Sequence, residues 1–339
     1  MRSAPIFCRS LATWLSTVRL TGYGGGPVAL MTYAQAGCEA LRAALRADPR
    51  RVVLGEDVGR GGIFQQYKGL QQEFGEARVI DTPISESTIM GAAVGMALAG
   101  LRPVVEMRVV DFALCAMDEI VNQAAKARYM FGGQGRVPLV ARMPGGLWSG
   151  SAAQHSQSLE AWFAHVPGLV VVAPSTPQDN FSLLAAALEC GDPVVYLEHK
   201  ELWGLQGDVS ARKAALGKAQ IVRQGSDVTL VTWSRTLHTA LEMQTDLSVE
   251  IIDLRTLWPW DRETVLASAA KTGRLLVAHE AVQAGGFGAE IAATVAEELG
   301  VPVKRLGAPR IPVGYSSPLE DEARVSGRAF MAALKQLVS

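Results

Sequence analysis

The sequence has few cysteines, almost no net charge and no long apolar run, and each absence argues against a class of protein. Its four cysteines, Cys8, Cys38, Cys115 and Cys190, lie far apart and form no C-x-x-C pair. That distribution fits a reducing compartment and supports neither a disulfide framework nor a zinc site. The formal net charge is -1, so we expect neither nucleic acid nor a membrane surface as a partner. No apolar stretch reaches the roughly 18 residues that a membrane-spanning helix needs.

Common nucleotide-binding and hydrolase motifs are absent too. There is no G-x-x-x-x-G-K-[ST] loop, and no G-x-G-x-x-G between a predicted strand and helix. Ser149 lies in the stretch GLWSG at 146–150, one residue out of step with the G-x-S-x-G elbow of serine hydrolases. No histidine, cysteine and aspartate cluster has the spacing of zinc ligands. Any catalytic chemistry therefore depends on other residues.

The chain has 339 residues, of which 49% are hydrophobic and 19% charged, enough for two globular domains. Its first part differs from the rest, because residues 1–30 contain Arg2, Arg9 and Arg19 but no Asp or Glu. That composition resembles an organellar transit peptide. The alternative is an extension without a fold that precedes a clean helical pattern beginning at Met31. We expect a cytoplasmic protein, or one of the mitochondrial matrix if residues 1–30 are a transit peptide.

Apolar strands alternate with helices over residues 31–205, which predicts a parallel sheet covered by helices on both faces. Thr32 and Gln35 form a capping-box pattern at the start of the first helix. Strands are predicted at 51–54, 78–81, 103–107, 137–142, 169–173 and 193–197, and helices at 36–47, 86–99, 117–130 and 177–190.

A second alternating set follows a mixed polar stretch at 199–217, which we predict to be a linker. It contains predicted strands at 228–232, 249–253, 275–278 and 301–305, with helices at 235–243, 262–270, 287–299 and 323–337. The predicted fold class is therefore α/β, with two parallel-sheet domains at about 31–205 and 215–339.

Small residues recur every fourth position on the predicted helix 86–99, at Gly91, Gly95 and Ala99. They form one stripe on the helix surface. Because each glycine costs a helix about 1 kcal/mol, the stripe predicts another helix packed at close range. That helix lies either within the same domain or in another subunit.

Two side chains are candidates for catalysis. His155 lies in a loop of small residues, and imidazole is suited to proton transfer near neutral pH. Glu86 begins a nearly uncharged helix. Each has a simpler explanation, since a loop histidine can merely satisfy a turn and a glutamate at a helix start can complement the helix dipole.

Several motifs in register resemble one enzyme family. They are GEDV at 55–58, DTPISE at 81–86, GLRPV at 100–104, QHSQS at 154–158, DLRTL at 253–257, HEA at 279–281 and GGFG at 285–288. From about Met31 to the C-terminus, the chain resembles the beta subunit of the thiamine-diphosphate-dependent first component of 2-oxo acid dehydrogenase complexes, within the transketolase-like group. The resemblance implies a pyrimidine-binding domain followed by a transketolase C-terminal-like domain.

The acetoin dehydrogenase branch is the most similar in its motifs. The stretches AMD at 116–118, VNQAAK at 121–126, YMFGG at 129–133 and SLEAW at 158–162 resemble that branch. Pyruvate dehydrogenase beta subunits share most of them. The resemblance therefore implies cleavage of acetoin or decarboxylation of pyruvate, with transfer of the acyl group to lipoamide. A branched-chain 2-oxo acid dehydrogenase beta subunit is an alternative.

The resemblance also assigns roles to residues. Glu86 matches the glutamate that hydrogen-bonds a ring nitrogen of the cofactor's aminopyrimidine, and Phe112 matches the aromatic residue that packs on that ring. Ile84 belongs to the same cofactor-binding group. His155 matches the histidine that assists acyl transfer to lipoamide. Arg108 stands where relatives usually carry Gln or Met near the cofactor, and it either alters substrate choice or cofactor geometry or pairs with Asp111.

The family's diphosphate and magnesium motif, Gly-Asp-Gly with a downstream Asn, does not occur in this sequence. The resemblance therefore implies that this chain binds only the pyrimidine half of thiamine diphosphate. An alpha subunit is expected to hold the magnesium ion and the diphosphate, in a heterotetramer of two alpha and two beta subunits. A dihydrolipoyl acyltransferase core is the further expected partner. If Arg108 instead spoils the cofactor site, the chain is a non-catalytic assembly subunit.

Relatives often bind a structural potassium ion through backbone carbonyls. The matching positions here are Leu139, Ala187, Leu188, Cys190 and Asp192.

Overall fold

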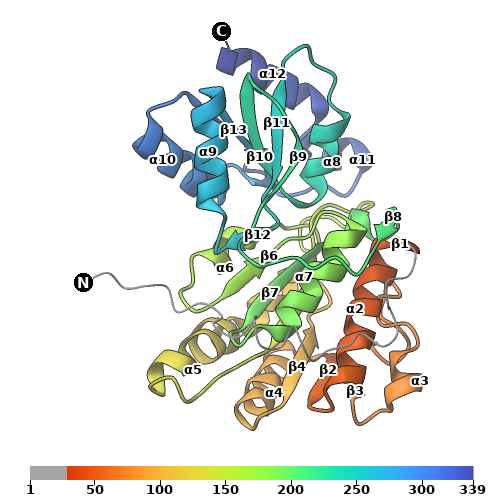
Figure 1. Cartoon of the computed structure of the whole chain (residues 1–339). Helices are drawn as coiled ribbons and strands as arrows, with labels where there is room; N and C mark the ends of the chain where they lie inside the picture. The colour runs from red at the N-terminus through yellow and green to blue at the C-terminus, as the bar shows by residue number, and fades with distance from the viewer. Residues whose placement is uncertain (1–28, 339) are drawn as a thin grey trace.

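The computed structural model describes residues 29–338. It has the predicted α/β fold, with two mainly parallel sheets that lie one above the other in Figure 1. The transit-peptide or extension prediction for residues 1–30 lies outside the described residues, apart from Ala29 and Leu30. Between residues 29 and 338, no helix is both long and apolar enough to cross a membrane.

The N-terminal sheet has seven strands in the order β12-β6-β7-β5-β4-β2-β3, all parallel except β12, which runs antiparallel to β6. Their bounds are β2 Arg51–Gly55, β3 Val79–Asp81, β4 Arg102–Glu106, β5 Val140–Gly145, β6 Val170–Val172, β7 Val194–His199 and β12 Thr256–Trp258. The associated helices are α2 Tyr33–Ala47, α3 Leu70–Phe74, α4 Glu86–Leu98, α5 Ala125–Met130, α6 Glu160–Ala164 and α7 Pro177–Glu189. Shorter helical turns are η1 Val110–Ala116, η2 Glu119–Ala124 and η3 Lys200–Leu202.

Strand side chains alternate between two cores on the two faces of this sheet. In β4, Val104 packs into the core under α2 and α7, and the next residue, Val105, packs into the core under α4. This period of two is why the strands read as continuous apolar runs, since both faces are covered.

The C-terminal sheet has five strands in the order β14-β13-β10-β11-β9, of which only the edge strand β9 is antiparallel to its neighbour. The strands are β9 Gln220–Arg223, β10 Val228–Thr232, β11 Val249–Asp253, β13 Leu275–Val282 and β14 Val303–Ala308. The helices are α8 Ser234–Glu242, α9 Arg262–Thr272, α10 Gly288–Leu299, α11 Ser317–Glu322 and α12 Gly327–Val338.

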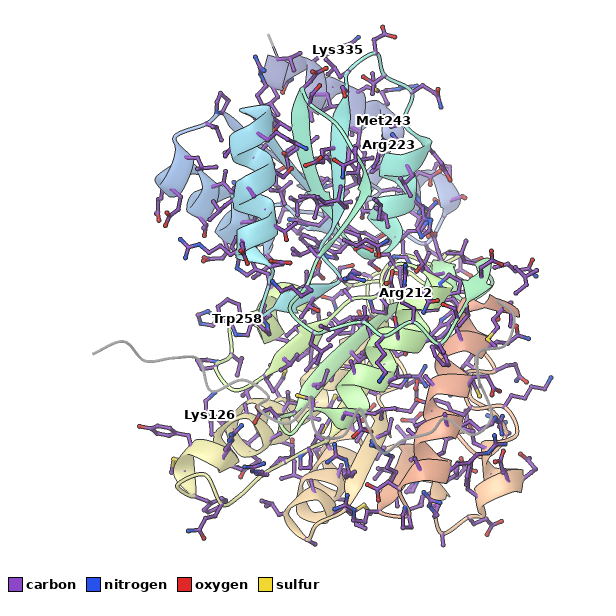
Figure 2. All side chains as sticks on the ribbon, in the orientation of Figure 1. Lys126, Arg212, Arg223, Met243, Trp258 and Lys335 are labelled. Atoms are coloured by element: carbon purple, nitrogen blue, oxygen red, sulfur yellow. The ribbon has the colours of Figure 1, made fainter. Side chains whose placement is uncertain are left out.

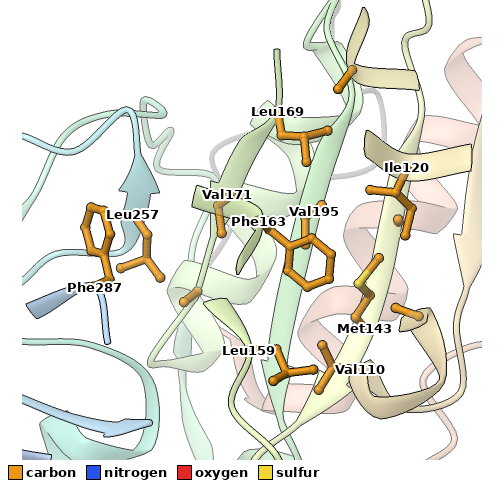
Figure 3. Close-up of a cluster of buried hydrophobic side chains, with 14 of the residues drawn as sticks. Val110, Ile120, Met143, Leu159, Phe163, Leu169, Val171, Val195, Leu257 and Phe287 are labelled. Atoms are coloured by element: carbon orange, nitrogen blue, oxygen red, sulfur yellow. The ribbon is translucent and has the colours of Figure 1, made fainter. Parts of the chain in front are cut away.

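One hydrophobic core continues from the first sheet into the second. Leu257 of β12 and Phe287, which precedes α10, belong to the same cluster as Phe163 and Val171 of the N-terminal sheet region. Figure 3 shows Leu257 and Phe287 beside Val171. β12 comes from the C-terminal half of the sequence but pairs with β6 of the N-terminal sheet. The two halves therefore share a sheet as well as a core, and the domain boundaries at 31–205 and 215–339 stay predictions.

The structure confirms most predicted elements and changes some. The Thr32–Gln35 capping box is present. Met31, however, lies in β1 Ala29–Thr32, which pairs with β8 Gln206–Val209 inside the predicted linker. The predicted helix at 117–130 opens as the π-helix η2, and the predicted helix at 323–337 begins only at 327, after the separate α11. Short edge strands and helix breaks leave little trace in an apolar pattern.

The small-residue stripe on α4 packs closely within the chain only at its start. A Cβ added at Gly91 would lie 3.6 Å from Cγ of Glu119, but one added at Gly95 would meet no described atom within 4 Å. Gly95 and Ala99 are exposed. Packing inside the domain therefore explains Gly91 alone, and a subunit interface at Gly95 stays a prediction.

Candidate functional site

The predicted site residues follow the carboxyl ends of parallel strands, which is where ligands bind in open α/β sheets. Gly55 ends β2 and residues 56–57 follow it, residues 107–112 follow β4, and the loop 146–158 follows β5. Glu86 is the first residue of α4, which follows β3. The sheet order β5-β4-β2-β3 makes these strands neighbours, so their ends share one edge.

His155 and Phe112 lie in contact at this edge. Their ring centroids are 5.1 Å apart, with the planes at 80°. The His155 side chain is exposed and Phe112 is half-buried. Two buried oxygens in the residues beside this pair, Oδ2 of Asp111 and Oγ of Ser156, have no hydrogen-bond partner among the described atoms. The exposed imidazole of His155 and the half-buried ring of Phe112 fit a polar heterocycle.

Arg108 is paired with Asp57 rather than with Asp111. Nη1 of Arg108 donates to Oδ2 of Asp57 at 2.5 Å, and Arg60 bonds the other carboxylate oxygen at 2.6 Å. Asp111 instead accepts from Nε2 of Gln157 at 2.8 Å. The Arg108–Asp111 pair, one of the alternatives for Arg108, is therefore wrong, because the Arg108 guanidinium is engaged by Asp57.

Glu56 and Glu86 are close enough to influence one another. Partial burial raises the pKa of Glu56, Arg108 opposes that shift, and the negative charge of Glu86 adds to it. Glu86 is half-buried at a helix start whose preceding Ser85 makes no side-chain cap. Ile84 is 78% exposed. The structure thus leaves a carboxylate and an apolar side chain available to a ligand or another subunit.

Two of the five predicted potassium ligands already accept hydrogen bonds from arginines. The carbonyl oxygens of Leu188 and Cys190 accept from Nη2 of Arg102 at 2.7 and 3.1 Å. The Leu188 carbonyl also accepts from Arg51 at 2.6 Å. Arg128 pairs with the side-chain carboxylate of Asp192 at 2.6 Å, not with its backbone carbonyl. A potassium ion would have to share the Leu188 and Cys190 oxygens with guanidinium groups, so these two carbonyls do not fit a cation as they stand, and a site at the other three stays a prediction.

Sequence reasoning missed the residues that join the His155 loop to the second sheet. Glu280, from β13, accepts from the Leu147 N–H at 2.8 Å and bonds Nε2 of His199 at 2.9 Å. Burial alone would raise the pKa of Glu280, but His199 and Leu147 together lower it to about 2. A cavity of about 40 Å³ lies here, lined in part by Gly146, Ser158 and Glu280. The HEA motif at 279–281 contains Glu280, but the sequence alone assigned no role to that residue.

Comparison with known proteins now identifies the family. Residues 29–205 match the transketolase pyrimidine-binding domain, and residues 217–329 match the transketolase C-terminal domain. The 2-oxoisovalerate dehydrogenase subunit beta of Bacillus subtilis is 40% identical over 91% of this chain and 99% of its own length. The chain belongs to the transketolase-like family of dehydrogenase beta subunits.

Other members of the dehydrogenase beta-subunit family are equally similar. The acetoin:2,6-dichlorophenolindophenol oxidoreductase subunit beta of Cupriavidus necator is 42% identical, covering 88% of this chain and 94% of its own. The pyruvate dehydrogenase E1 component subunit beta of Rickettsia bellii is also 42% identical, covering 88% and 97%. Three relatives with three names at nearly the same identity do not select a substrate.

A solved structure shares the fold at lower identity. A split-gene transketolase, described as an inactive beta4 tetramer, superposes with a TM-score of 0.75 over 92% of this chain and 99% of its own. Its sequence identity is 22%, so this likeness shows the fold alone.

Proposed function

We propose that this chain is the beta subunit of a thiamine-diphosphate-dependent dehydrogenase that cleaves acetoin or decarboxylates pyruvate. The acyl group passes to lipoamide on a dihydrolipoyl acyltransferase core. The observation that carries the proposal is the His155–Phe112 contact at the same sheet edge as Glu86, in a chain of this family. A branched-chain 2-oxo acid is the second candidate substrate, since a 2-oxoisovalerate dehydrogenase subunit beta is among the relatives.

The residues present fit the pyrimidine half of the cofactor. Phe112 offers a half-buried aromatic face, and Glu86 offers a carboxylate that can share a proton with a ring nitrogen. Ile84 is exposed for an apolar contact, and Arg108 adds a fixed positive charge beside Glu56. The Gly-Asp-Gly motif with a downstream Asn is absent, so we assign the diphosphate and magnesium to an alpha subunit, with two copies of each chain in the enzyme.

The proposed chemistry divides between the cofactor and this chain. Thiamine diphosphate, when bound, supplies carbanion stabilisation at the carbon that loses its bond. Glu86 holds the proton shared with the pyrimidine, and Phe112 fixes the orientation of that ring. His155 then gives a proton to the lipoamide sulfur that leaves as the disulfide opens. Its exposed position allows a mobile lipoyl arm to reach it.

The experiment uses the chain reconstituted with its cognate alpha subunit. Glu86→Ala is expected to lower turnover by about 100-fold or more, as removal of a proton-transfer partner does. Glu290→Ala is a matched control, because Glu290 also lies in the first turn of a helix, α10, and is exposed. Full turnover by Glu86→Ala would show that the assigned role is wrong.

Two measurements on the native tetramer decide the remaining alternatives. Comparison of kcat/KM for acetoin, pyruvate and 2-oxoisovalerate identifies the substrate. Calorimetry with thiamine diphosphate and magnesium tests the cofactor site directly. Absence of saturable, magnesium-dependent binding would support a non-catalytic assembly subunit instead.

A further inference from the structure

The loop 146–158, which carries His155, has few hydrogen bonds of its own. The Gly146 N–H donates to the Gln157 carbonyl at 3.0 Å and ties the two ends together. Between them, the Ser151 N–H and hydroxyl both donate to the Trp148 carbonyl, and the His155 N–H donates to the Ala152 carbonyl at 3.3 Å. Ser149 and Ala152 have φ values of 44° and 60°, which non-glycine residues disfavour. A loop with this backbone persists only when its surroundings fix it.

Glu280 holds both ends of the loop. Its Oε1 accepts from the Leu147 N–H at 2.8 Å and from Oγ of Ser158 at 3.4 Å. The space is full, since a Cβ added at Gly146 would lie 2.7 Å from the same oxygen and still closer to the His199 ring. The C-terminal sheet thus sets the position of the loop ends.

Two more charged groups hold the middle of the loop. Glu320 of α11, 4% exposed, accepts from the Gly150 N–H through Oε2 at 2.5 Å. Lys200 of η3, 2% exposed, donates from Nζ to the carbonyl oxygen of His155. Burial lowers the pKa of Lys200, against the opposing negative charges of Asp111, Glu280 and Glu320.

Lys200 is therefore the one side chain among those described that hydrogen-bonds the backbone of His155 itself. A buried ammonium is costly unless it is paired and hydrogen-bonded, so its presence here calls for an explanation beyond packing. We infer that Lys200 is a positioning residue for His155, and that Glu280 and Glu320 complete the support from the C-terminal sheet. This inference rests on the proposed role of His155.

The test separates two partial reactions of the reconstituted enzyme. Acyl transfer to lipoamide requires His155 in position, whereas oxidation of the bound substrate by dichlorophenolindophenol bypasses the lipoyl group. Lys200→Met keeps the length of the side chain but removes the donor. We expect its rate of lipoamide acylation to fall about 10- to 100-fold, because small misplacements of a catalytic group are costly. The dichlorophenolindophenol rate and the KM for substrate are expected to change less than about twofold, because Lys200 bonds only the loop.

Lys126→Met is the matched control. Nζ of Lys126 also donates to a backbone carbonyl, that of Pro167, at 2.6 Å, and Lys126 lies in α5, as Figure 2 shows. Its variant should match the native enzyme in both partial reactions. Lys200→Arg, which keeps a donor and a charge, should recover part of the lost acylation. Glu320→Ala, a milder change at the other support, should lower acylation several-fold.

Combining Lys200→Met with His155→Ala separates failure of the role proposed for His155 from failure of the role inferred for Lys200. If His155→Ala retains acylation, the proposed role of His155 fails, and the inference falls with it. If His155→Ala loses acylation but Lys200→Met does not, the inference alone is overturned. The expected result is that Lys200→Met causes no further loss in the His155→Ala background, which a general structural defect would not reproduce. Equal losses in both partial reactions would also overturn it.

Discussion

Arg108 and Asp57 hold each other at the candidate site in backbone conformations that their side chains disfavour. Their φ values are 57° and 59°, and the ion pair between them measures 2.5 Å. A left-handed non-glycine residue costs about 1 kcal/mol or more, and a partly exposed ion pair contributes at most about that amount. The ion pair alone therefore does not offset the cost of this conformation at Arg108, whereas Asp is one of the residues that tolerate it.

The protonation of Glu106, the last residue of β4, predicts how the free energy of unfolding depends on pH. Glu106 is 3% exposed, it accepts from the Tyr67 hydroxyl at 2.5 Å, and burial raises its pKa from 4.5 to about 7, against the opposing charge of Arg142. The folded state therefore holds this proton between about pH 4.5 and 7, where the unfolded chain releases it. Stability from this group is complete below the unfolded pKa and is lost as the pH rises through 7.

The corresponding experiment is urea unfolding of Glu106→Gln, which keeps the acceptor but cannot ionise. Relative to the native chain, the free energy of unfolding of this variant should rise by about 3 kcal/mol between pH 4.5 and pH 8. Glu76→Gln, at an exposed position, should show no such change. A difference that does not depend on pH would contradict the assignment.

At the scale of the helix, α4 presents an exposed face that its own domain leaves uncovered. Ile84 precedes it at 78% exposure, Leu98 near its end is 46% exposed, and Gly95 lies between them with no described atom near its Cβ position. An apolar helix face with no charged residue is typical of a subunit interface. The sequence left open whether the small-residue stripe packs within its own domain or against another subunit, and this exposed face favours the subunit.

Two variants at Gly95 test that interface. Gly95→Ala should raise the free energy of unfolding of the isolated chain by up to about 1 kcal/mol, because alanine favours a helix over glycine. Gly95→Leu should fold equally well but assemble poorly with the alpha subunit or with a second copy of this chain. Sedimentation velocity measures the assembly. Normal assembly of Gly95→Leu would show that this face lies outside every interface.

The elements that sequence predicted well are those whose evidence is local. The strand at 51–54 and the helix beginning at Glu86 follow from apolar runs and turn residues next to them in the chain. The pairing of β1 with β8 was missed because it joins segments more than 170 residues apart, as in the Ala29–Val209 register. The same limit applies to the site, since Glu280 lies 133 residues from Leu147 and Lys200 lies 45 from His155. A charged side chain that hydrogen-bonds a distant backbone group leaves no periodic pattern in the sequence, so such contacts could not be predicted.

At the scale of the whole molecule, the two sheets share one core and several buried polar contacts. Nε1 of Trp233 donates to Glu160 at 3.2 Å, and Oγ of Ser175 donates to Asp253 at 2.9 Å. Trp258, labelled at the junction in Figure 2, ends the strand that crosses into the N-terminal sheet. The support of the His155 loop by Glu280 and Glu320 therefore depends on a junction that is built as a continuous interior.

This continuity predicts that the chain unfolds in a single step, which calorimetry measures. Leu257 is fully buried in the shared core. Leu257→Ala should lower the free energy of unfolding by about 2 to 5 kcal/mol. Leu276 is equally buried, but it lies in a cluster confined to the C-terminal half, so Leu276→Ala is the matched comparison. If the sheets unfold together, both variants lower the temperature of one common transition. If they unfold separately, two transitions appear and Leu276→Ala moves only one of them. In that case the C-terminal sheet can move independently, and the geometry of the His155 loop would change with it.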